Sequence, residues 1–529
     1  MSAPPHLSRI AILVERDALS LWVMALAKAL ESRIGAEIAV VVSDLAGGSG
    51  EPAFGTLLNL ETLVVRRGRA CWSDRITPDC LGKYRQRAIG AADLIVDLTA
   101  AGVASPSIPI LRPTFQDRLG EAGLAGLLLL GITPEIVVER MEPGGDAPRE
   151  LVHGVASLEA AAGIGGGMEA VWSRLLLMLL AAIEKRGMVS PMREPPQKPA
   201  RAVRRRDLVR YSVRLLAATA ARAAYRLCFH GPHWRIGWRI TDAADDVWNR
   251  RDLAGVTWNV LRDPVDHFYA DPFPFIRDGR RHIFFEALDH RTQKGIIACS
   301  VFGADGKPGP AVPIIEEPWH MSYPFVFEAE GATWMIPESS LSSEITLYRA
   351  TDFPLRWERH ATLVDNVEAA DATIVSHGGK LWMFAVTRQD IGGYSDTLAI
   401  WMADRLTGPW RPHGGNPVLI HDRLARPAGH MLHRDGALLR PVQDCRNGYG
   451  AGLGLARITR LDEEHFEQVV ETWLKPGPGW PGRKLHTLNR FGDLEVIDGG
   501  VFRPKWESAA RLIDRLYEPV STTPQPVRA

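Results

Sequence analysis

The sequence predicts two unlike folded parts: an α/β domain over residues 1–187 and an all-β five-bladed β-propeller over residues 231–506. Three observations lead to this prediction. Apolar runs alternate with helical patterns in the first part, a hairpin pattern recurs five times in the second, and a proline-rich, basic stretch at residues 188–230 separates them. A chain of 529 residues is long enough for about three structural units at roughly 100–200 residues each.

Strands and helices alternate along the first domain. A helix is expected at Ala18–Glu31, and strands are expected at Ile10–Val14, Ala36–Val42, Leu63–Val65 and Leu94–Leu98. This alternation predicts a parallel sheet with helices on its faces. Glycines at 163 and 165–167 lack the spacing of a phosphate-binding loop, so we expect a turn there, followed by a helix at Met168–Arg186.

The stretch at residues 188–230 is interpreted as a linker followed by a basic helix that ends near Cys228. Residues 191–230 hold ten basic and two acidic residues, a net charge of +8, so the other 489 residues carry −8. A basic amphipathic helix can lie on anionic lipid, which would give peripheral membrane contact. The alternative, which the pattern favours, is a solvated helix packed between two domains.

The propeller is predicted from an internal repeat. Segments beginning at Asp271, Tyr323 and Asp371 carry a glycine at the same offset, and two less regular copies begin at Arg426 and His486. The intervals of 52, 48, 55 and 60 residues suit one four-stranded blade each. Trp357 and Trp410 are expected to pack on outer strands, and residues 507–529 are expected to form a C-terminal tail.

Each copy is a hairpin, so its first and last residues should lie at the same end of the blade. If these are the inner strands, the hairpin ends form a polar ring at one mouth of the channel: Asp271, Tyr323, Asp371, Arg426 and His486, with Glu286, Glu338 and Gln443. Crowded carboxylates perturb one another's pKa values and can supply an acid and a base. The alternative is that these groups only close the channel through mutual hydrogen bonds.

The segments Tyr269–Phe273 and His282–Glu286 resemble the first blade of the five-bladed propeller glycoside hydrolases of the arabinanase, xylosidase and invertase type. That resemblance implies that Asp271 is a base or nucleophile. Those hydrolases place a second acid at the start of blade two, where this sequence has Tyr323. We therefore expect Glu338 as proton donor and Asp371 as a residue that tunes its pKa, giving Asp271, Glu338 and Asp371 as the catalytic set.

Residues from about Trp234 to Glu467 resemble more closely the N-terminal propeller domain of the glucosamine inositolphosphorylceramide transferase family. The motifs that carry this resemblance are His320–Phe325, Ile336–Ser339, Asn416–Pro417, Arg426–Gly429 and Arg440–Asp444, with Tyr449–Gly450 following. Together with the ring, they give the expected substrate-binding residues: Glu286, His320, Tyr323, Arg426, Arg440, Gln443, Tyr449 and His486.

The first domain resembles, mainly in layout, the Rossmann-like formyltransferase-like domain found in front of bacterial propellers of this type. Active formyltransferases carry a histidine in a segment that reads Ile108–Phe115 here, and this segment has none. His153 and Asp117 stand in no matching motif. The resemblance therefore implies a degenerate domain.

Composition excludes several classes of function. Lys+Arg and Asp+Glu are both 62, so no chain-wide nucleic-acid footprint exists. Five scattered cysteines predict a protein without structural zinc, and we expect no other metal and no cofactor. The absence of a secretion signal and of a long apolar run predicts a cytoplasmic protein, in which the basic helix could contact the inner membrane.

We expect glycosidic-bond chemistry on a glycan or glycolipid. The alternatives are a non-catalytic sugar-binding propeller that supports a glycosyltransferase, and formyl or acyl transfer to an amino sugar by the first domain.

Overall fold

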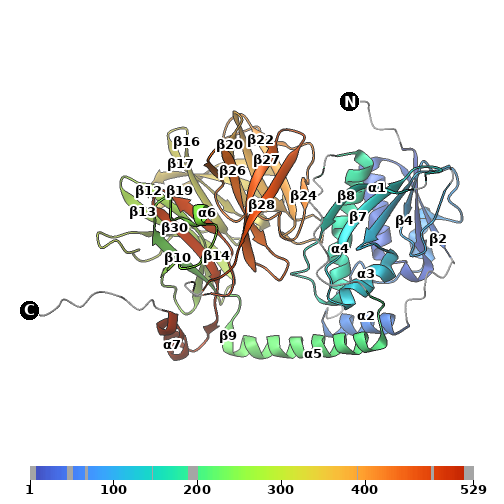
Figure 1. The fold of residues 1–529 in the computed structure, drawn as a ribbon, viewed down its shortest axis with the longest axis horizontal. Helices are drawn as coiled ribbons and strands as arrows, with labels where there is room; N and C mark the ends of the chain where they lie inside the picture. Colours follow the sequence, from blue (N-terminus) through green and yellow to red (C-terminus); the bar gives the residue numbers. More distant parts are fainter. Residues whose placement is uncertain are drawn as a thin grey trace, which may run out of the picture.

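The computed structural model describes residues 7–43, 52–65, 69–105, 107–145, 147–186, 188, 201–389, 391–477, 480 and 482–517. Two parts lie side by side, an N-terminal α/β domain and a β-propeller, and the long helix α5 (Arg205–Cys228) runs along one edge of both (Figure 1). The proline-rich segment expected at residues 191–199 lies outside the described residues.

The N-terminal domain contains one mixed sheet with strand order β3-β2-β1-β4-β5-β7-β8, with β6 paired to β5. The strands are β1 (Arg9–Glu15), β2 (Glu37–Ser43), β3 (Arg85–Gln86), β4 (Leu94–Asp97), β5 (Ile110–Phe115), β6 (Arg118–Leu119), β7 (Glu135–Met141) and β8 (Arg149–Val155). Neighbouring strands from β3 to β5 are parallel, as predicted, whereas β7 and β8 are antiparallel. A connection of seven residues joins β7 to β8, which is too short for a parallel crossover.

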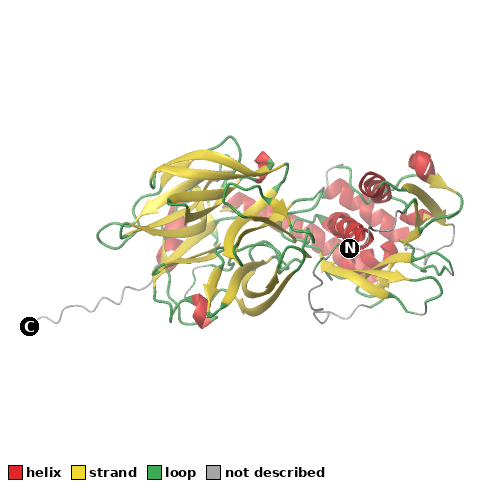
Figure 2. Ribbon diagram, turned by 90° about the horizontal axis from the view of Figure 1, so that it is seen from above, coloured by secondary structure: helices red, strands yellow, loops and turns green. Residues whose placement is uncertain are grey.

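The prediction that helices cover both faces of this sheet is wrong. All four helices contribute to one large core, which contains the strand residues Ile10, Ile12 and Val14. The core on the opposite face contains Ala11 and Leu13, and among the described residues it includes none from a helix. Figure 2 shows the same two-layer arrangement, with the helices on one side of the strands. The helices are α1 (Leu21–Ile34), α2 (Pro52–Val64), α3 (Gly120–Leu129) and α4 (Gly163–Glu184), with the 3-10 turns η1 (Arg16–Ala18) and η2 (Pro78–Tyr84).

Two local predictions in this domain are also corrected. Leu63 and Val64 end α2 and Val65 follows in a turn, so Leu63–Val65 is not a strand. The glycine run is the first turn of α4, where the Glu61 carboxylate accepts the N–H groups of Ile164 (2.8 Å) and Gly165 (3.0 Å). Gly163 has a φ of 77°, and a Cβ there would lie 2.6 Å from Glu61, so glycine is required.

One described helix, α4, is long and apolar enough to cross a membrane, but 78% of its most apolar window is buried inside the protein. It lies at the centre of the N-terminal core, where it packs against α1, α2 and α3.

The propeller has five blades, as predicted. The strands of the first four blades are ordered from inside outward. Blade one contains β12 (His267–Arg277), β13 (Arg280–Asp289), β14 (Lys294–Val301) and β15 (Val312–Ile315), and blade two contains β16 (Ser322–Ala329), β17 (Ala332–Glu338), β18 (Glu344–Asp352) and β19 (Arg356–Asp365). Blade three contains β20 (Ala369–His377), β21 (Lys380–Thr387), β22 (Thr397–Ala403) and β23 (Arg411–Pro412), with β24 (Leu419–Ile420), and blade four contains β25 (Leu432–Arg434), β26 (Ala437–Asp444), β27 (Gly452–Leu461) and β28 (Phe466–Leu474). Trp357 and Trp410 pack against the core between the outer strands, as expected.

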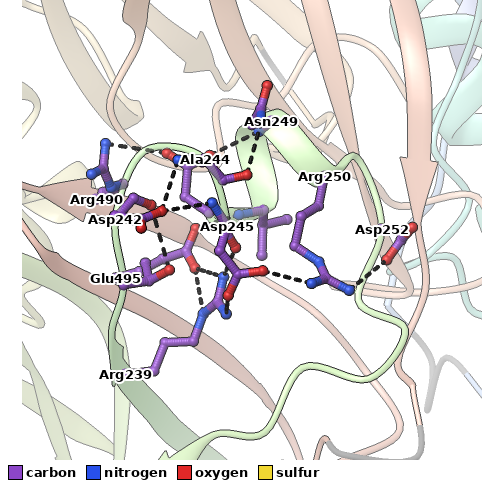
Figure 3. A network of polar contacts seen from close by, with 12 residues as sticks. Arg239, Asp242, Ala244, Asp245, Asn249, Arg250, Asp252, Arg490 and Glu495 are labelled. Carbon is purple, nitrogen blue, oxygen red and sulfur yellow. Dashed lines mark hydrogen bonds and ion pairs between the residues drawn. The ribbon is translucent and has the colours of Figure 1, made fainter.

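The fifth blade closes the ring by joining the two ends of the propeller sequence. Its inner strands β29 (Leu488–Phe491) and β30 (Leu494–Gly500) follow the fourth blade, whereas its outer strands β10 (Trp234–Ile240) and β11 (Asn259–Val260) precede the first. A polar network that runs from buried Arg239 and Glu495 to exposed Asp245 and Arg250 holds this junction (Figure 3). Arg239 of β10 donates to Glu495 of β30 (2.7 Å), and Glu495 accepts the N–H of Val247 (2.8 Å) in the short helix α6 (Val247–Arg250).

Beyond the fifth blade, β31 (Arg503–Pro504) pairs with β9 (Phe229–His230) at the end of α5. The sequence beyond this point was expected to be a tail, but its first part forms α7 (Glu507–Tyr517), which Arg503 anchors through Asp514 (2.8 Å). The 3-10 turn η3 (Ser340–Ser342) lies in blade two.

The two domains are joined by a buried ion pair. Arg174 of α4 donates to Asp396 (2.6 Å), which also accepts the N–H of Ser157 (2.7 Å). The side chains of Arg174 and Asp396 are both almost fully buried, and a Cβ at Gly392 would collide with the Arg174 guanidinium. Such a pair is costly to break, because either charge alone would remain buried. The N-terminal domain is therefore fixed against blade three of the propeller.

Candidate functional site at the channel mouth

The five predicted hairpins are present, and their first strands line the channel. At Asp271, Tyr323 and Asp371 the hairpin ladder is interrupted by a β-bulge. All three residues have a positive φ, at 52°, 44° and 57°. This conformation is uncommon for residues other than glycine, and bulges of this kind redirect a side chain at functional sites.

Asp271, His486 and Asp498 form one buried cluster. His486 Nδ1 lies 3.0 Å from Asp271 Oδ1 and donates a hydrogen bond to Asp498 Oδ2 (3.2 Å). Asp498 also accepts the N–H of Asp271 (2.8 Å), and Asp271 accepts the N–H of Tyr323 (3.3 Å). Asp498 of blade five thus binds the backbone of blade one, and Asp271 of blade one binds the backbone of blade two.

Asp371, Glu338, Arg426 and Gln443 form a second cluster beside the first. Arg426 Nε donates to Asp371 Oδ2 at 2.6 Å, and its guanidinium lies 3.9 Å from Glu338. Gln443 donates to the same Asp371 oxygen (3.2 Å). The Glu338 side chain is 12% exposed against 1% for Asp371, so Glu338 is the member of this cluster that faces solvent.

Glu286 and His320 form a third group at the edge of the ring. His320 Nδ1 accepts the N–H of Gly295 (3.0 Å), which places the imidazole proton on Nε2, 3.3 Å from Glu286 Oε1. Burial lowers the pKa of His320, which favours this neutral form. His320 therefore presents a donor to the carboxyl group of Glu286.

Burial governs the electrostatics of the site. Burial raises the pKa of Asp371 to about 7, although Arg426 opposes the shift. It also raises the pKa of Asp271 and of Glu338, and that of Glu286 rises well above its usual range through burial and the charges of Asp271 and Glu338. For His486, burial lowers the pKa, but Asp271 and Asp498 outweigh it and hold the imidazole protonated.

These groups offer both proton donors and proton acceptors near neutral pH. One oxygen of Asp371 has no hydrogen-bond donor among the described residues, whereas the Asp271 oxygens contact His486 and the Tyr323 N–H. A buried carboxylate with a free oxygen is uncommon unless it serves a ligand or a reaction. The arrangement can therefore protonate a leaving group and activate or replace a nucleophile.

Tyr449 joins the ring as expected. Its ring lies under the Arg426 guanidinium (4.7 Å) and against His486 (4.6 Å between ring centroids), and its hydroxyl accepts from Arg426 (3.2 Å). Burial raises its pKa well above the usual value. Tyr449 thus bridges the two clusters.

Two of the expected substrate-binding side chains point elsewhere. The Tyr323 side chain is fully buried, and its hydroxyl pairs with Thr373 (3.0 Å), so only its backbone N–H serves the ring. The Arg440 guanidinium bonds to the carbonyls of Leu424 and Ala425 and to Gln468 (2.9 Å) inside blade four. These donors are committed to the fold, because β26 turns Arg440 toward the blade interior.

Two residues near the mouth were missed by the sequence analysis. Asp498 ends the fifth hairpin, so the rule that selected Glu286, Glu338 and Gln443 also selects Asp498. Glu159 comes from the N-terminal domain: Ser395 donates to it, and it interacts electrostatically with Arg426 and with Lys484. No sequence signal placed Glu159 here, because the domain interface brings it to the propeller.

The group best suited to hold a metal ion is the first cluster. Asp271, His486 and Asp498 offer ligand atoms within 4.8 Å of one another. The His486 nitrogen is already hydrogen-bonded to Asp498, and the three charges neutralise one another in part. The expectation of a site without metal stays a prediction.

The comparisons with known proteins concern the propeller. Residues 260–495 match the family model described as glucosamine inositolphosphorylceramide transferase 1, N-terminal. The propeller is related to that family in sequence. Glucosamine inositolphosphorylceramide transferase 1 of Oryza sativa subsp. japonica is 34% identical over 248 residues, which cover 44% of this chain and 33% of the relative.

The protein of the same name from Arabidopsis thaliana is 31% identical over 245 residues, 45% of this chain and 31% of the relative. The chain thus spans about a third of the length of these plant relatives. Among solved structures, a family 117 glycoside hydrolase of Zobellia galactanivorans is 12% identical with a TM-score of 0.32, covering 46% of this chain and 77% of that one. An α-L-arabinanase of Cellvibrio cellulosa, solved with arabinohexaose, is 15% identical with a TM-score of 0.29, covering 38% and 77%.

Proposed function

We propose that the propeller carries out acid/base or nucleophilic chemistry at a glycosidic bond of a glycan or glycolipid. The observation that supports this proposal best is the convergence of Asp271, Glu338 and Asp371 at one mouth, with raised pKa values and one carboxylate oxygen of Asp371 without a hydrogen-bond donor among the described residues. Glycosidases need such a pair of carboxyl groups in different protonation states.

Roles follow from exposure and contacts. Glu338 is the proton donor, because it is the most exposed of the three and burial raises its pKa, which favours the protonated form. Asp271 is the base or nucleophile, because protonated His486 favours its ionised form. Asp371 tunes Glu338 through a side-chain contact that lowers the pKa of Glu338, and Asp371 is itself held by Arg426. Arg426, Tyr449 and His320 would bind the substrate.

The substrate class that we favour is a sugar joined to an anionic headgroup. Arg426 offers a guanidinium at the mouth, and the names of the plant relatives refer to a glucosamine inositolphosphorylceramide. The headgroup probe for the experiment is therefore glucosaminyl-inositol phosphate, tested together with a panel of p-nitrophenyl glycosides.

The test compares wild type with Asp271→Asn and Glu338→Gln, followed by mass spectrometry of products. Loss of the general acid lowers turnover by roughly 10²–10⁴-fold. Asp278→Asn is the matched control, because Asp278 occupies the exposed turn at the opposite end of β12 with a φ of 51° that Asn tolerates. Unchanged turnover in Asp271→Asn would refute the assignment.

The second candidate is a propeller that binds sugar without reaction and supports a glycosyltransferase. The observation in its favour is that the Asp271 side chain is only 3% exposed and is held by His486 and the Tyr323 N–H. Binding on a glycan array that Asp271→Asn retains, with no product from any probe, would support it. No observation on the described residues favours formyl or acyl transfer by the N-terminal domain. That activity stays a prediction.

A further inference from the structure

Helix α5 is exposed along almost its entire length. Of its 24 residues only Asp207 is buried. Its inner side borders a cleft of about 600 Å³ that is lined by both leucines and arginines, including Leu128, Leu158, Arg210 and Arg214. Most helical stability in proteins comes from packing of an apolar face. An uncovered helix of this length therefore suggests a partner surface.

The outer side of α5 carries an apolar stripe. Val209, Val213, Leu216 and Leu227 are 65%, 61%, 50% and 76% exposed. Their spacing of 4, 3 and 11 residues places all four within about 60° of one another on the helix. Soluble proteins expose single apolar residues freely, but an aligned set on one helix is typical of an interaction face.

Arginines border the stripe. Arg206 lies next to the stripe, and Arg210 and Arg214 continue from it toward the cleft that they also line; all three are exposed, and none forms an ion pair with a described residue. Asp207, the acidic residue of the helix, is already neutralised by Arg201 at 2.7 Å. The face is thus apolar along its centre and cationic at its margin, which is the pattern of helices that lie in a lipid interface.

Exposed aromatic residues lie beside the C-terminal end of α5. Phe502 and Trp506 are 42% and 58% exposed. Phe502 packs against Tyr225 of α5 (6.2 Å), and Lys505 bonds to the carbonyls of Cys228 and Arg226. Figure 1 shows α5 and α7 along the same lower edge of the molecule. Tryptophan at this position suits the boundary between headgroups and acyl chains.

We propose that the outer stripe of α5, together with Phe502 and Trp506, docks this protein on an anionic lipid bilayer. A second copy of the same surface is not the partner, because the arginines of the two α5 helices would then face one another. The apolar stripe distinguishes the surface from a nucleic-acid site, where phosphate contacts would leave Val209, Val213 and Leu216 in water. The proposal is independent of the reaction at the channel mouth.

The test is sedimentation of the full chain with vesicles of phosphatidylcholine alone and of phosphatidylcholine with phosphatidylglycerol at 3:1. We expect binding to the anionic vesicles only. Val213→Asp with Leu216→Asp should weaken it by at least tenfold, because two charges would have to enter the apolar boundary. Arg206→Gln, Arg210→Gln and Arg214→Gln together should weaken it on the order of 100-fold, at about 1 kcal/mol for each arginine near an anionic surface.

Val469→Asp is the matched control, because Val469 is 52% exposed on the outer strand β28 and should leave vesicle binding unchanged. Circular dichroism and unchanged product formation at the channel mouth show that the variants are folded. Equal binding to both vesicle types, no binding to either, or wild-type binding by Val213→Asp with Leu216→Asp would overturn the proposal. Retention of a DNA duplex without vesicle binding would assign the face to nucleic acid instead.

Discussion

The N-terminal domain and the propeller bury acidic residues in opposite ways. In the N-terminal domain, Asp97 accepts the N–H groups of Thr99 (3.0 Å) and Val103 (2.8 Å), the Thr99 hydroxyl and Arg112 (3.0 Å). Both of its oxygens are occupied. At the channel mouth, Asp371 keeps one buried oxygen without a hydrogen bond from a described residue, and the Asp271 oxygens contact only His486 and the Tyr323 N–H.

We propose that this difference separates a structural acid from a reactive one. A carboxylate with all its acceptors filled stabilises the backbone that surrounds it, and Asp97 in this way holds the loop between β4 and β5. A carboxylate with a free buried oxygen contributes less to stability and is positioned for a ligand. The two regions therefore predict different consequences for the same kind of substitution.

The largest expected effect is on turnover, through Asp271→Asn. The change removes the proposed base or nucleophile without changing volume and leaves Asp498 as the partner of His486, so we expect turnover to fall by roughly 10²–10⁴-fold while stability falls less than in Asp97→Ala. Product formation and thermal unfolding of the same preparation check this. A variant that loses stability but keeps turnover would place Asp271 with Asp97 and remove the contrast between the regions.

The next effect is on stability, through Asp97→Ala. Removal of one partner from a buried ion pair leaves Arg112 without its carboxylate, so we expect the free energy of unfolding of the N-terminal domain to fall by about 3–5 kcal/mol. Urea unfolding measures the change. Asp79→Ala, an exposed surface pair with Arg85, is the control and should cost less than about 0.5 kcal/mol. Equal losses in the two variants would contradict the structural role of Asp97.

A third effect concerns pH. Because burial raises the pKa of Asp371 to about 7 in the folded state, the folded protein holds a proton there that the unfolded chain releases near pH 4. Stability should therefore fall as pH rises from about 4 to about 7. Asp371→Asn should reduce that fall, as measured by urea unfolding at several pH values. An unchanged slope would show that Asp371 is ionised throughout this range.

The smallest effect tests the contact between the regions. Glu159→Gln keeps the Ser395 contact but removes a charge near Arg426, so we expect a change of a few-fold in KM and little change in kcat. Steady-state kinetics with the active glycoside or headgroup probe measures both. A large fall in kcat would instead make Glu159 a member of the reacting set.

The sequence predicted the propeller and most of its ring because the repeat is strict. Glycine recurs at the hairpin turn of three copies, and strand pairing then fixes which residues share an end of the blade. Asp271, Asp371, Arg426 and His486 meet for this reason. The same rule selects Asp498, which the sequence analysis left out although it closes the fifth hairpin.

Other features depended on contacts that no local pattern encodes. Leu63–Val65 is apolar in a strand as in a helix, and its place at the end of α2 follows from packing against α4. Arg440 and Tyr323 belong to the motifs that predicted the polar ring. In the structure the Arg440 side chain points into blade four, and the Tyr323 hydroxyl pairs with Thr373. Closure of blade five by β10 depends on pairing between strands about 260 residues apart.

By itself, the sequence determined the two fold classes, the number of blades, the ends of the hairpins and the excess of charge in α5, because each depends on periodicity or composition along the chain. Only the tertiary structure decided which acids keep a free oxygen, that Glu159 reaches the propeller, and that the apolar stripe of α5 stays uncovered. Burial, hydrogen-bond satisfaction and domain contacts arise between residues far apart in sequence, so they exist only once the chain has folded.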